Sequence, residues 1–253
     1  MRKTFKTLFC LVVLAVMLAA MAAPALADVT RVKNLGDGSV EVRWDDKDVM
    51  ALILVPKIGD DMDEDLDQYG YIYEDVGNGK TQVIYYAAPG QDYWIATLSS
   101  EFDLSDPYVY SPGPAPRFTE WRTQPYFSDW QLKEKYKNNK PTNLSALSAR
   151  DLESQDDDTG YGVAFHYNYP QLKAERNYLG QIVITDPDGI PYVDYAFNET
   201  LSAGNTYHYS DYYVLDDYFD NMILDRGFVL VGVYDFSLYW DGMLVCSTTF
   251  RVR

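Results

Sequence analysis

The chain has 253 residues, of which 38 are Asp or Glu and 21 are Lys or Arg, so its formal net charge is −17. A protein this acidic repels phosphate backbones and anionic membranes, which argues against nucleic acid as a partner. Aromatic residues make up 15% of the sequence and include 23 Tyr, a composition typical of half-buried β-strands.

The first 27 residues have the pattern of a secretory signal peptide. A basic start precedes an apolar run over residues 8–23, and Ala25-Leu26-Ala27 fits the small-residue rule for cleavage. We therefore predict cleavage before Asp28 and a secreted or cell-surface location. Cleavage removes three basic and no acidic residues, so the net charge moves from −17 to −20. No later stretch approaches the roughly 20 apolar residues of a membrane helix, so no membrane insertion is expected after cleavage.

Strand patterns begin at residue 39. Alternating polar and apolar residues predict a half-buried strand over 39–44, and an apolar run closed by Pro56 predicts a buried strand over 49–55. The Asp-rich stretch 59–68 keeps no apolar period, so it is predicted to be a loop. Further strands are predicted over 69–73, 82–86 and 93–98.

Residues 29–122 resemble a fibronectin type III module. The resemblance rests partly on Val40, Val42 and Trp44, which share one face of a strand. It rests also on a Pro-Gly turn four residues before Tyr93, which opens an alternating strand. In that family the Trp packs in the core and the Tyr caps a corner through its hydroxyl, so the resemblance implies these roles for Trp44 and Tyr93.

A polar region divides the chain into two β-rich parts. Residues 111–116 are Pro-rich and indicate an edge strand or an exit segment. Residues 126–159 are mostly polar, end near three consecutive Asp residues, and are interpreted as a linker with a short helix within 128–139. We therefore predict two β-sandwich modules in tandem, over residues 28–125 and 160–253.

The second part continues the strand patterns. Strands are predicted over 161–169, 181–185, 192–197 and 206–215, followed by a helical turn over 216–226 and a hairpin over 227–252. An Asp-Pro-Asp-Gly turn follows the second of these strands. This order is similar to that of immunoglobulin-like modules of bacterial secreted and surface proteins. The fold class predicted for the whole chain is all-β, with immunoglobulin-like and fibronectin type III-like sandwiches.

The final hairpin turns at Asp241-Gly242, because both central residues of a type I′ turn need φ > 0. Such a turn places Trp240 opposite Met243, and alternation then assigns the faces. The face predicted as core carries Val231, Val233, Ser237, Tyr239, Leu244, Cys246, Thr248, Phe250 and Val252. The other face is too apolar for a solvated one, so either a second layer covers it or it is a contact patch. A bulge near 235–237 would exchange the faces.

One acidic stretch matches the ligand spacing of a calcium loop. Asp63, Asp65 and Asp67 stand at positions 1, 3 and 5, and Glu74 stands at position 12. Position 6 is Gln68, where such a loop has Gly. The alternatives are a calcium site and a solvated acidic loop.

The sequence predicts binding rather than catalysis. The two His residues lie alone in predicted strands, and no hydrolase or phosphate-loop motif occurs, so no catalytic residue and no cofactor other than calcium are expected. We expect a secreted bacterial binding or surface-interaction protein that meets a protein or a glycan. The predicted contact residues are Trp94, Phe236, Leu238 and Trp240. The alternatives are a carbohydrate-binding accessory of an extracellular enzyme system and a structural envelope component.

Overall fold

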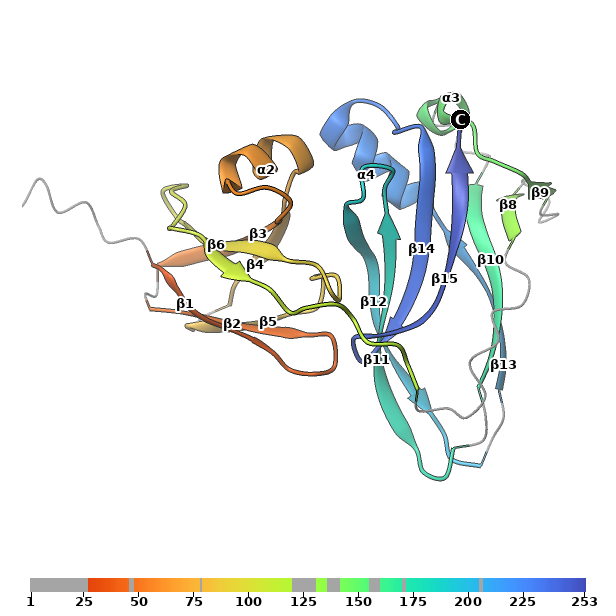
Figure 1. Ribbon diagram of the computed structural model, residues 1–253, viewed down its shortest axis with the longest axis horizontal. Coiled ribbons are helices and arrows are strands. Elements are labelled where there is room, and N and C mark those ends of the chain that lie inside the picture. Colours follow the sequence, from red (N-terminus) through yellow and green to blue (C-terminus); the bar gives the residue numbers. More distant parts are fainter. Residues whose placement is uncertain are drawn as a thin grey trace, which may run out of the picture.

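The computed structural model of this chain describes residues 27–45, 48–77, 79–119, 131–135, 142–154, 160–169, 172–204 and 207–253. Within these ranges the strands form four antiparallel sheets, which confirms the predicted all-β class. Figure 1 shows two lobes, which we call the N-terminal lobe (27–116) and the C-terminal lobe (117–253). The predicted signal peptide lies outside the described residues, apart from Ala27.

The N-terminal lobe contains a three-stranded sheet and a four-stranded sheet. The first has the order β1-β2-β5, with β1 (Val29–Asn34), β2 (Val40–Trp44) and β5 (Thr81–Ile84). The second has the order β4-β3-β6-β7, with β4 (Ile72–Asp75), β3 (Val49–Pro56), β6 (Tyr93–Ser99) and β7 (Tyr108–Tyr110). Apolar side chains from both sheets meet in one buried cluster. The two sheets therefore form the two layers of a sandwich.

Two roles that the sequence predicted in this lobe are confirmed. Trp44 is 3% exposed and belongs to the buried cluster between the sheets. Tyr93 is fully buried, and its hydroxyl accepts a hydrogen bond of 3.0 Å from the backbone N–H of Ala88. The hydroxyl thereby holds the corner that precedes β6.

The acidic stretch predicted as a loop instead contains helix α2 (Met62–Tyr69). The carboxylate of Asp61 caps its N-terminus by accepting hydrogen bonds from the backbone N–H groups of Asp63 and Glu64. Acidic residues in the first turn also interact favourably with the positive end of the helix dipole. The loop prediction was wrong because it counted charge repulsion alone and omitted the cap.

The described part of the C-terminal lobe contains two four-stranded sheets and two helices. One sheet has the order β13-β10-β8-β9, with β13 (Tyr207–Val214), β10 (Gly160–Tyr169), β8 (Gln131–Lys135) and β9 (Thr142–Leu144). The other has the order β12-β11-β14-β15, with β12 (Pro191–Leu201), β11 (Arg176–Thr185), β14 (Gly232–Trp240) and β15 (Met243–Val252). Helices α3 (Ala149–Glu153) and α4 (Asp216–Arg226) lie at one end of the lobe (Figure 1).

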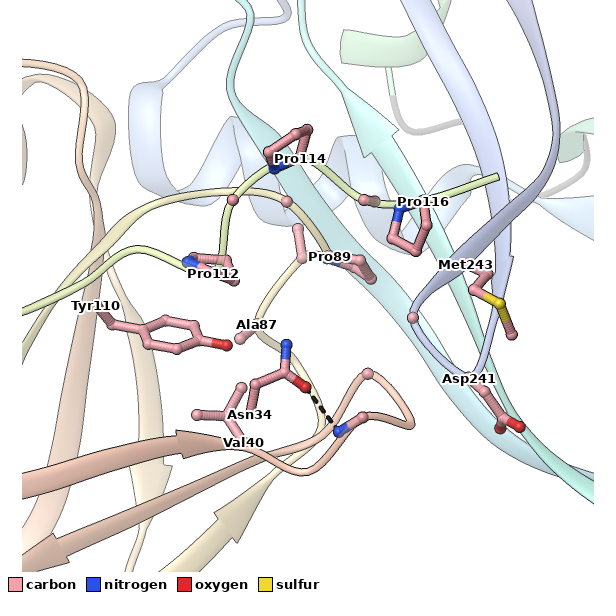
Figure 2. Close-up of a pocket in the computed structure, with 17 residues that line it drawn as sticks. Asn34, Val40, Ala87, Pro89, Tyr110, Pro112, Pro114, Pro116, Asp241 and Met243 are labelled. Atoms are coloured by element: carbon pink, nitrogen blue, oxygen red, sulfur yellow. Dashed lines mark hydrogen bonds between the residues drawn. The ribbon is translucent and has the colours of Figure 1, made fainter. Parts of the chain in front are cut away.

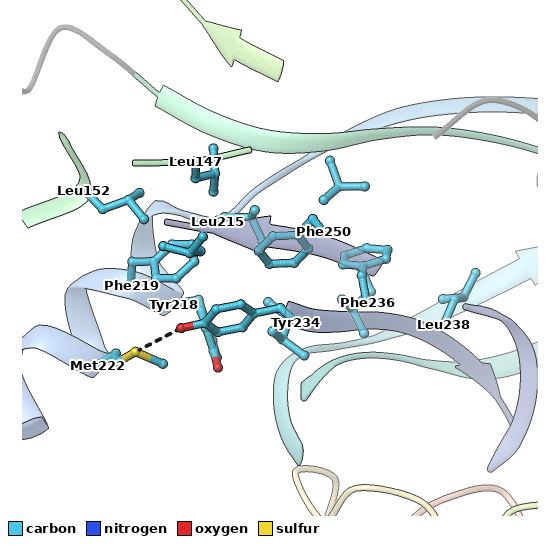
Figure 3. Close-up of a cluster of buried hydrophobic side chains, with 14 of the residues drawn as sticks. Leu147, Leu152, Leu215, Tyr218, Phe219, Met222, Tyr234, Phe236, Leu238 and Phe250 are labelled. Atoms are coloured by element: carbon cyan, nitrogen blue, oxygen red, sulfur yellow. Dashed lines mark hydrogen bonds between the residues drawn. The ribbon is translucent and has the colours of Figure 1, made fainter. Parts of the chain in front are cut away.

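The core of this lobe is rich in aromatic side chains, and α4 contributes to it (Figure 3). The rings of Tyr234 and Phe250 stack with their centroids 5.2 Å apart, and Phe219 of α4 meets Tyr234 edge-on at 5.6 Å. The Tyr234 hydroxyl donates a hydrogen bond of 2.7 Å to the backbone oxygen of Leu230. Aromatic residues of the final hairpin, such as Tyr234 and Phe250, are therefore part of the buried core of this lobe.

The hairpin confirms the predicted turn and corrects the predicted faces. Asp241 and Gly242 both have positive φ, and Trp240 pairs with Met243. The register then shifts between Leu238 and Tyr239, a β-bulge that exchanges the faces of β14 relative to β15. The predicted contact residues Phe236, Leu238 and Trp240 are 1%, 2% and 0% exposed. The second layer covers this face, whereas Val231 and Val233, predicted as core, are 62% and 45% exposed.

Residues interpreted as a linker take part in the C-terminal lobe. Strand β8 pairs with β10 and β9 pairs with β8, so part of 126–159 extends a sheet. The prediction of a short helix within 128–139 is wrong for residues 131–135, because these residues form strand β8. Phe118 also belongs to this lobe: its N–H donates a hydrogen bond of 2.9 Å to the oxygen of Leu244.

Candidate functional site

Trp94, a predicted contact residue, is held inside the N-terminal lobe. Its side chain is 8% exposed, and its indole N–H donates a hydrogen bond of 2.8 Å to a carboxylate oxygen of Asp65. The ammonium group of Lys57 lies 4.0 Å from the ring centroid, a cation–π contact. Trp94 therefore docks helix α2 on the sheet and leaves little ring surface for a ligand.

The predicted calcium ligands are not brought together. Asp63 and Asp67 are exposed on α2, and Glu74 lies on β4. Asp65 is 3% exposed, and its carboxylate accepts hydrogen bonds from two backbone amides in addition to the Trp94 indole. Among the described residues no three His, Cys, Asp or Glu side chains are grouped so that they could hold a metal ion. Of the four residues predicted as calcium ligands, Asp65 has a structural role instead, because its carboxylate accepts hydrogen bonds within the protein.

A buried glutamine joins the two lobes. Gln181 of β11 is 0% exposed, and its side-chain amide donates hydrogen bonds of 2.6 Å to the oxygen of Tyr85 and 3.3 Å to the oxygen of Ala87. Both acceptors belong to the segment between β5 and β6 of the N-terminal lobe. Beside them Ala88 packs on Val183 and Val193. The N-terminal lobe therefore rests on the outer face of the sheet that contains β11 and β12.

Two glycine turns complete this junction by backbone contact. Gly38 and Gly242 both have positive φ, which favours glycine. A Cβ atom added to Gly38 would lie 2.9 Å from the backbone nitrogen of Gly242, so a side chain there would push the two turns apart. The orientation of the lobes thus depends on local residues of the β1–β2 turn and the β14–β15 turn.

A cavity of about 240 Å³ lies at the same junction, between these turns and a Pro-rich segment (Figure 2). Its lining is largely apolar and includes Tyr110, Met243 and the rings of Pro89, Pro112, Pro114 and Pro116. Its polar side chains have partners within the protein. Asn34 accepts a hydrogen bond from the N–H of Gly36 at 2.7 Å, and Asp241 accepts one from the N–H of Leu179 at 2.9 Å. The cavity therefore offers few polar groups for recognition.

A second candidate, at edge strand β12, has both aromatic and polar groups. We call it the aromatic edge, and it consists of Tyr86, Tyr192, Asp194, Tyr195 and Phe197. Tyr86, Tyr192 and Tyr195 are 40%, 38% and 50% exposed. The rings of Tyr195 and Phe197 are stacked with centroids 5.4 Å apart. Tyr86 comes from the other lobe, two residues before Ala88, which packs on Val193 of β12. Burial is the main cause of the raised pKa of Tyr192, and Asp194, Asp225 and then Tyr86 act in the same direction.

The charged group of the aromatic edge is placed there by a β-bulge. The register between β11 and β12 shifts at Ile182 and Val183, which leaves Asp194 as an extra residue on β12. Its carboxylate accepts a hydrogen bond of 2.8 Å from the hydroxyl of Tyr213 on the neighbouring sheet. Burial raises the pKa of Asp194 to about 6, and the charge of Asp217 acts in the same direction, against the Tyr213 hydrogen bond.

This arrangement can bind a ligand that offers flat apolar faces and hydrogen-bond donors. Exposed aromatic rings accept apolar faces, and a half-buried carboxylate accepts hydrogen bonds from hydroxyl or amino groups. The guanidinium of Arg226 on α4 already pairs with Asp186 and Asp188 at 3.3 Å each. The site therefore suits a neutral or amino-bearing ligand better than an anionic one.

Sequence reasoning did not identify the aromatic edge. Its residues come from the β5–β6 segment and from β12, which are more than a hundred positions apart. The bulge at Asp194 also breaks the alternation by which faces are read from a sequence. The only local signal was the density of Tyr between residues 192 and 213.

Asp194 is expected to make stability depend on pH. Its pKa in the folded protein, about 6, lies above the ordinary value of 3.8, so its contribution to stability declines as pH rises through that window. The Asp194→Asn variant should lack this decline, and its urea midpoint relative to wild type should be higher at pH 7.5 than at pH 4.5. Asp220→Asn, an exposed change on α4, is the control. An equal difference at both pH values would contradict the buried position of Asp194.

Comparison of the sequence with protein-family models and with curated proteins gave no match. In the part of the chain that the structure describes, no helix has the length and apolar character needed to cross a membrane.

Proposed function

We propose that this chain is a non-catalytic binding protein that acts outside the cytoplasm and holds a neutral or amino-bearing carbohydrate on the aromatic edge. The observation that carries the proposal is the exposed Tyr195 ring stacked on Phe197 beside the half-buried carboxylate of Asp194. A sugar presents an apolar face of C–H groups to such a ring and hydroxyl donors to such a carboxylate. Junctions between lobes are also common positions for ligand sites.

The sandwich modules and the location are part of the same proposal. We propose that the N-terminal lobe is a fibronectin type III-like module and that the C-terminal lobe is an immunoglobulin-like module. The division of the first lobe into sheets of three and four strands supports this, as does the hydroxyl contact of Tyr93. The signal-peptide pattern of residues 1–27 supports a secreted or cell-surface location. The lobes would act as a rigid support for the ligand contacts.

A glycan array tests the proposed function. The wild-type protein is expected to bind at least one neutral or amino-bearing glycan, and Tyr195→Ala or Tyr86→Ala should weaken that binding by about tenfold or more, since aromatic anchors dominate such contacts. Tyr73→Ala is the matched control, because this Tyr is 43% exposed on β4, outside the aromatic edge. The proposal fails if no glycan binds, or if every bound glycan is held equally by the Tyr195 and Tyr86 variants.

A further inference from the structure

The loop after β6 holds a phenylalanine in an unfavourable backbone conformation. The chain reverses tightly here, because the N–H of Ser99 donates to the oxygen of Asp103 at 3.0 Å and Leu98 lies opposite Leu104. Hairpin loops of this length usually place glycine at a left-handed position. In this loop that position is taken by Phe102, with φ = 66°. A side chain as bulky as Phe is strained there.

The loop is rigidly built around this residue. The hydroxyl of Ser99 accepts hydrogen bonds from the backbone N–H groups of Glu101 at 3.2 Å and Asp103 at 3.1 Å. The N–H of Phe102 itself donates to the oxygen of Ser99 at 3.1 Å. These three bonds hold the strained backbone conformation in place, so the position from which the Phe102 side chain leaves the loop is defined.

The ring contributes little to the folding of this chain. Phe102 is 74% exposed, so it neither fills the core nor covers a neighbouring strand. An exposed apolar side chain and a strained backbone both disfavour the folded state, and backbone strain of this kind clusters at functional sites such as ligand contacts.

The surroundings of the ring are acidic. Glu101 and Asp103 flank it and are exposed, and the hydroxyl of Ser100 donates a hydrogen bond of 3.3 Å to the carboxylate of Asp48. The sequence from Thr81 to Pro116 contains no Lys or Arg. A partner surface that receives the ring must therefore carry positive charge around an apolar pocket.

We propose that residues 99–103, the Phe102 tip, form a docking surface for a partner protein that has an apolar pocket bordered by Lys or Arg. Phe102 is the anchor that enters the pocket, and the flanking carboxylates pair with its rim. This site is separate from the aromatic edge. The seven residues of β6 lead from the end of the lobe at the junction to the Phe102 tip. At about 3.3 Å per residue, the tip lies roughly 20 Å from that end of the lobe.

A library of random dodecapeptides displayed on phage, panned on the purified protein, tests this proposal. Selected peptides are expected to combine Lys or Arg with apolar residues, and Phe102→Ala and Phe102→Gly should weaken their binding by tenfold or more. Phe102→Gly should at the same time raise the urea midpoint, because glycine relieves the strain at φ = 66°. Phe228→Ala, at a residue 51% exposed in the other lobe, should change neither binding nor selection.

Four outcomes would overturn the proposal. In the first, panning selects no peptide whose binding depends on Phe102. In the second, the Phe102→Gly variant binds the selected peptides as tightly as the wild type does. In the third, the Phe102→Gly variant has a lower urea midpoint than the wild type. The fourth is Phe102-dependent binding to phosphatidylcholine vesicles without peptide binding, which would make the tip a membrane contact. None of these outcomes depends on whether the aromatic edge binds a glycan.

Discussion

Replacement of Trp240 by alanine is expected to lower the free energy of unfolding by about 3–5 kcal/mol. The Trp240 side chain is 0% exposed, and its ring lies 5.0 Å from that of Tyr178 and 6.2 Å from that of Phe118. Its removal would leave a cavity at the end of the C-terminal core, next to the segment that arrives from the N-terminal lobe. Urea unfolding followed by far-UV circular dichroism measures the change.

Val231→Ala is the matched control for this prediction. Val231 is 62% exposed just before β14, so its truncation should change the free energy of unfolding by no more than about 0.5 kcal/mol. An unchanged urea midpoint of Trp240→Ala would contradict the buried position of Trp240. If this variant altered ligand binding instead, Trp240 would be a contact residue, as the sequence predicted.

Asp65→Ala is expected to lower the free energy of unfolding by about 3 kcal/mol, because it leaves the Trp94 indole and two backbone amides without their acceptor. Asp67→Ala, an exposed change on the same helix, should cost no more than about 0.5 kcal/mol. Millimolar calcium should leave the unfolding midpoint of the wild type unchanged. A clear rise with calcium, or equal effects of the two substitutions, would favour a metal site over a structural carboxylate.

The pH dependence of the Asp65 variant provides a further check. Burial alone would raise the pKa of Asp65, but the hydrogen bonds from the Trp94 indole and the backbone outweigh it and hold this pKa below its ordinary value of 3.8. The stability that Asp65 contributes is therefore present above about pH 4 and is lost as pH falls through the lowered pKa. The difference between wild type and Asp65→Ala should shrink on acidification below that pH, and a constant difference would contradict the ionised state.

The local pattern of the sequence was sufficient for much of the fold. Strands such as β2 and β10 follow from alternation, and the turn at Asp241-Gly242 follows from the need for positive φ at both residues. Trp44 and Tyr93 take the positions implied by the fibronectin type III resemblance. Helix α2 was missed although its capping residue, Asp61, was visible, because charge repulsion was weighed without the cap.

The candidate site could not be predicted in the same way. The aromatic edge combines Tyr86 with residues of β12 from the other lobe, and only the packing of the lobes brings them together. The contact of Asp65 with Trp94 likewise joins a helix to a strand that follows it by about 30 residues. The pattern of a single strand or helix carries no information about such pairs.

The sequence by itself determined that this protein is made of twisted β-strands with tight turns, because strand and turn preferences depend on residues that are neighbours in the chain. Only the tertiary structure decided which faces are buried and which aromatic rings reach solvent. One extra residue in a β-bulge reverses the alternation of the strand beyond it, as in β15 and β12, and the partner sheet then determines which side is covered.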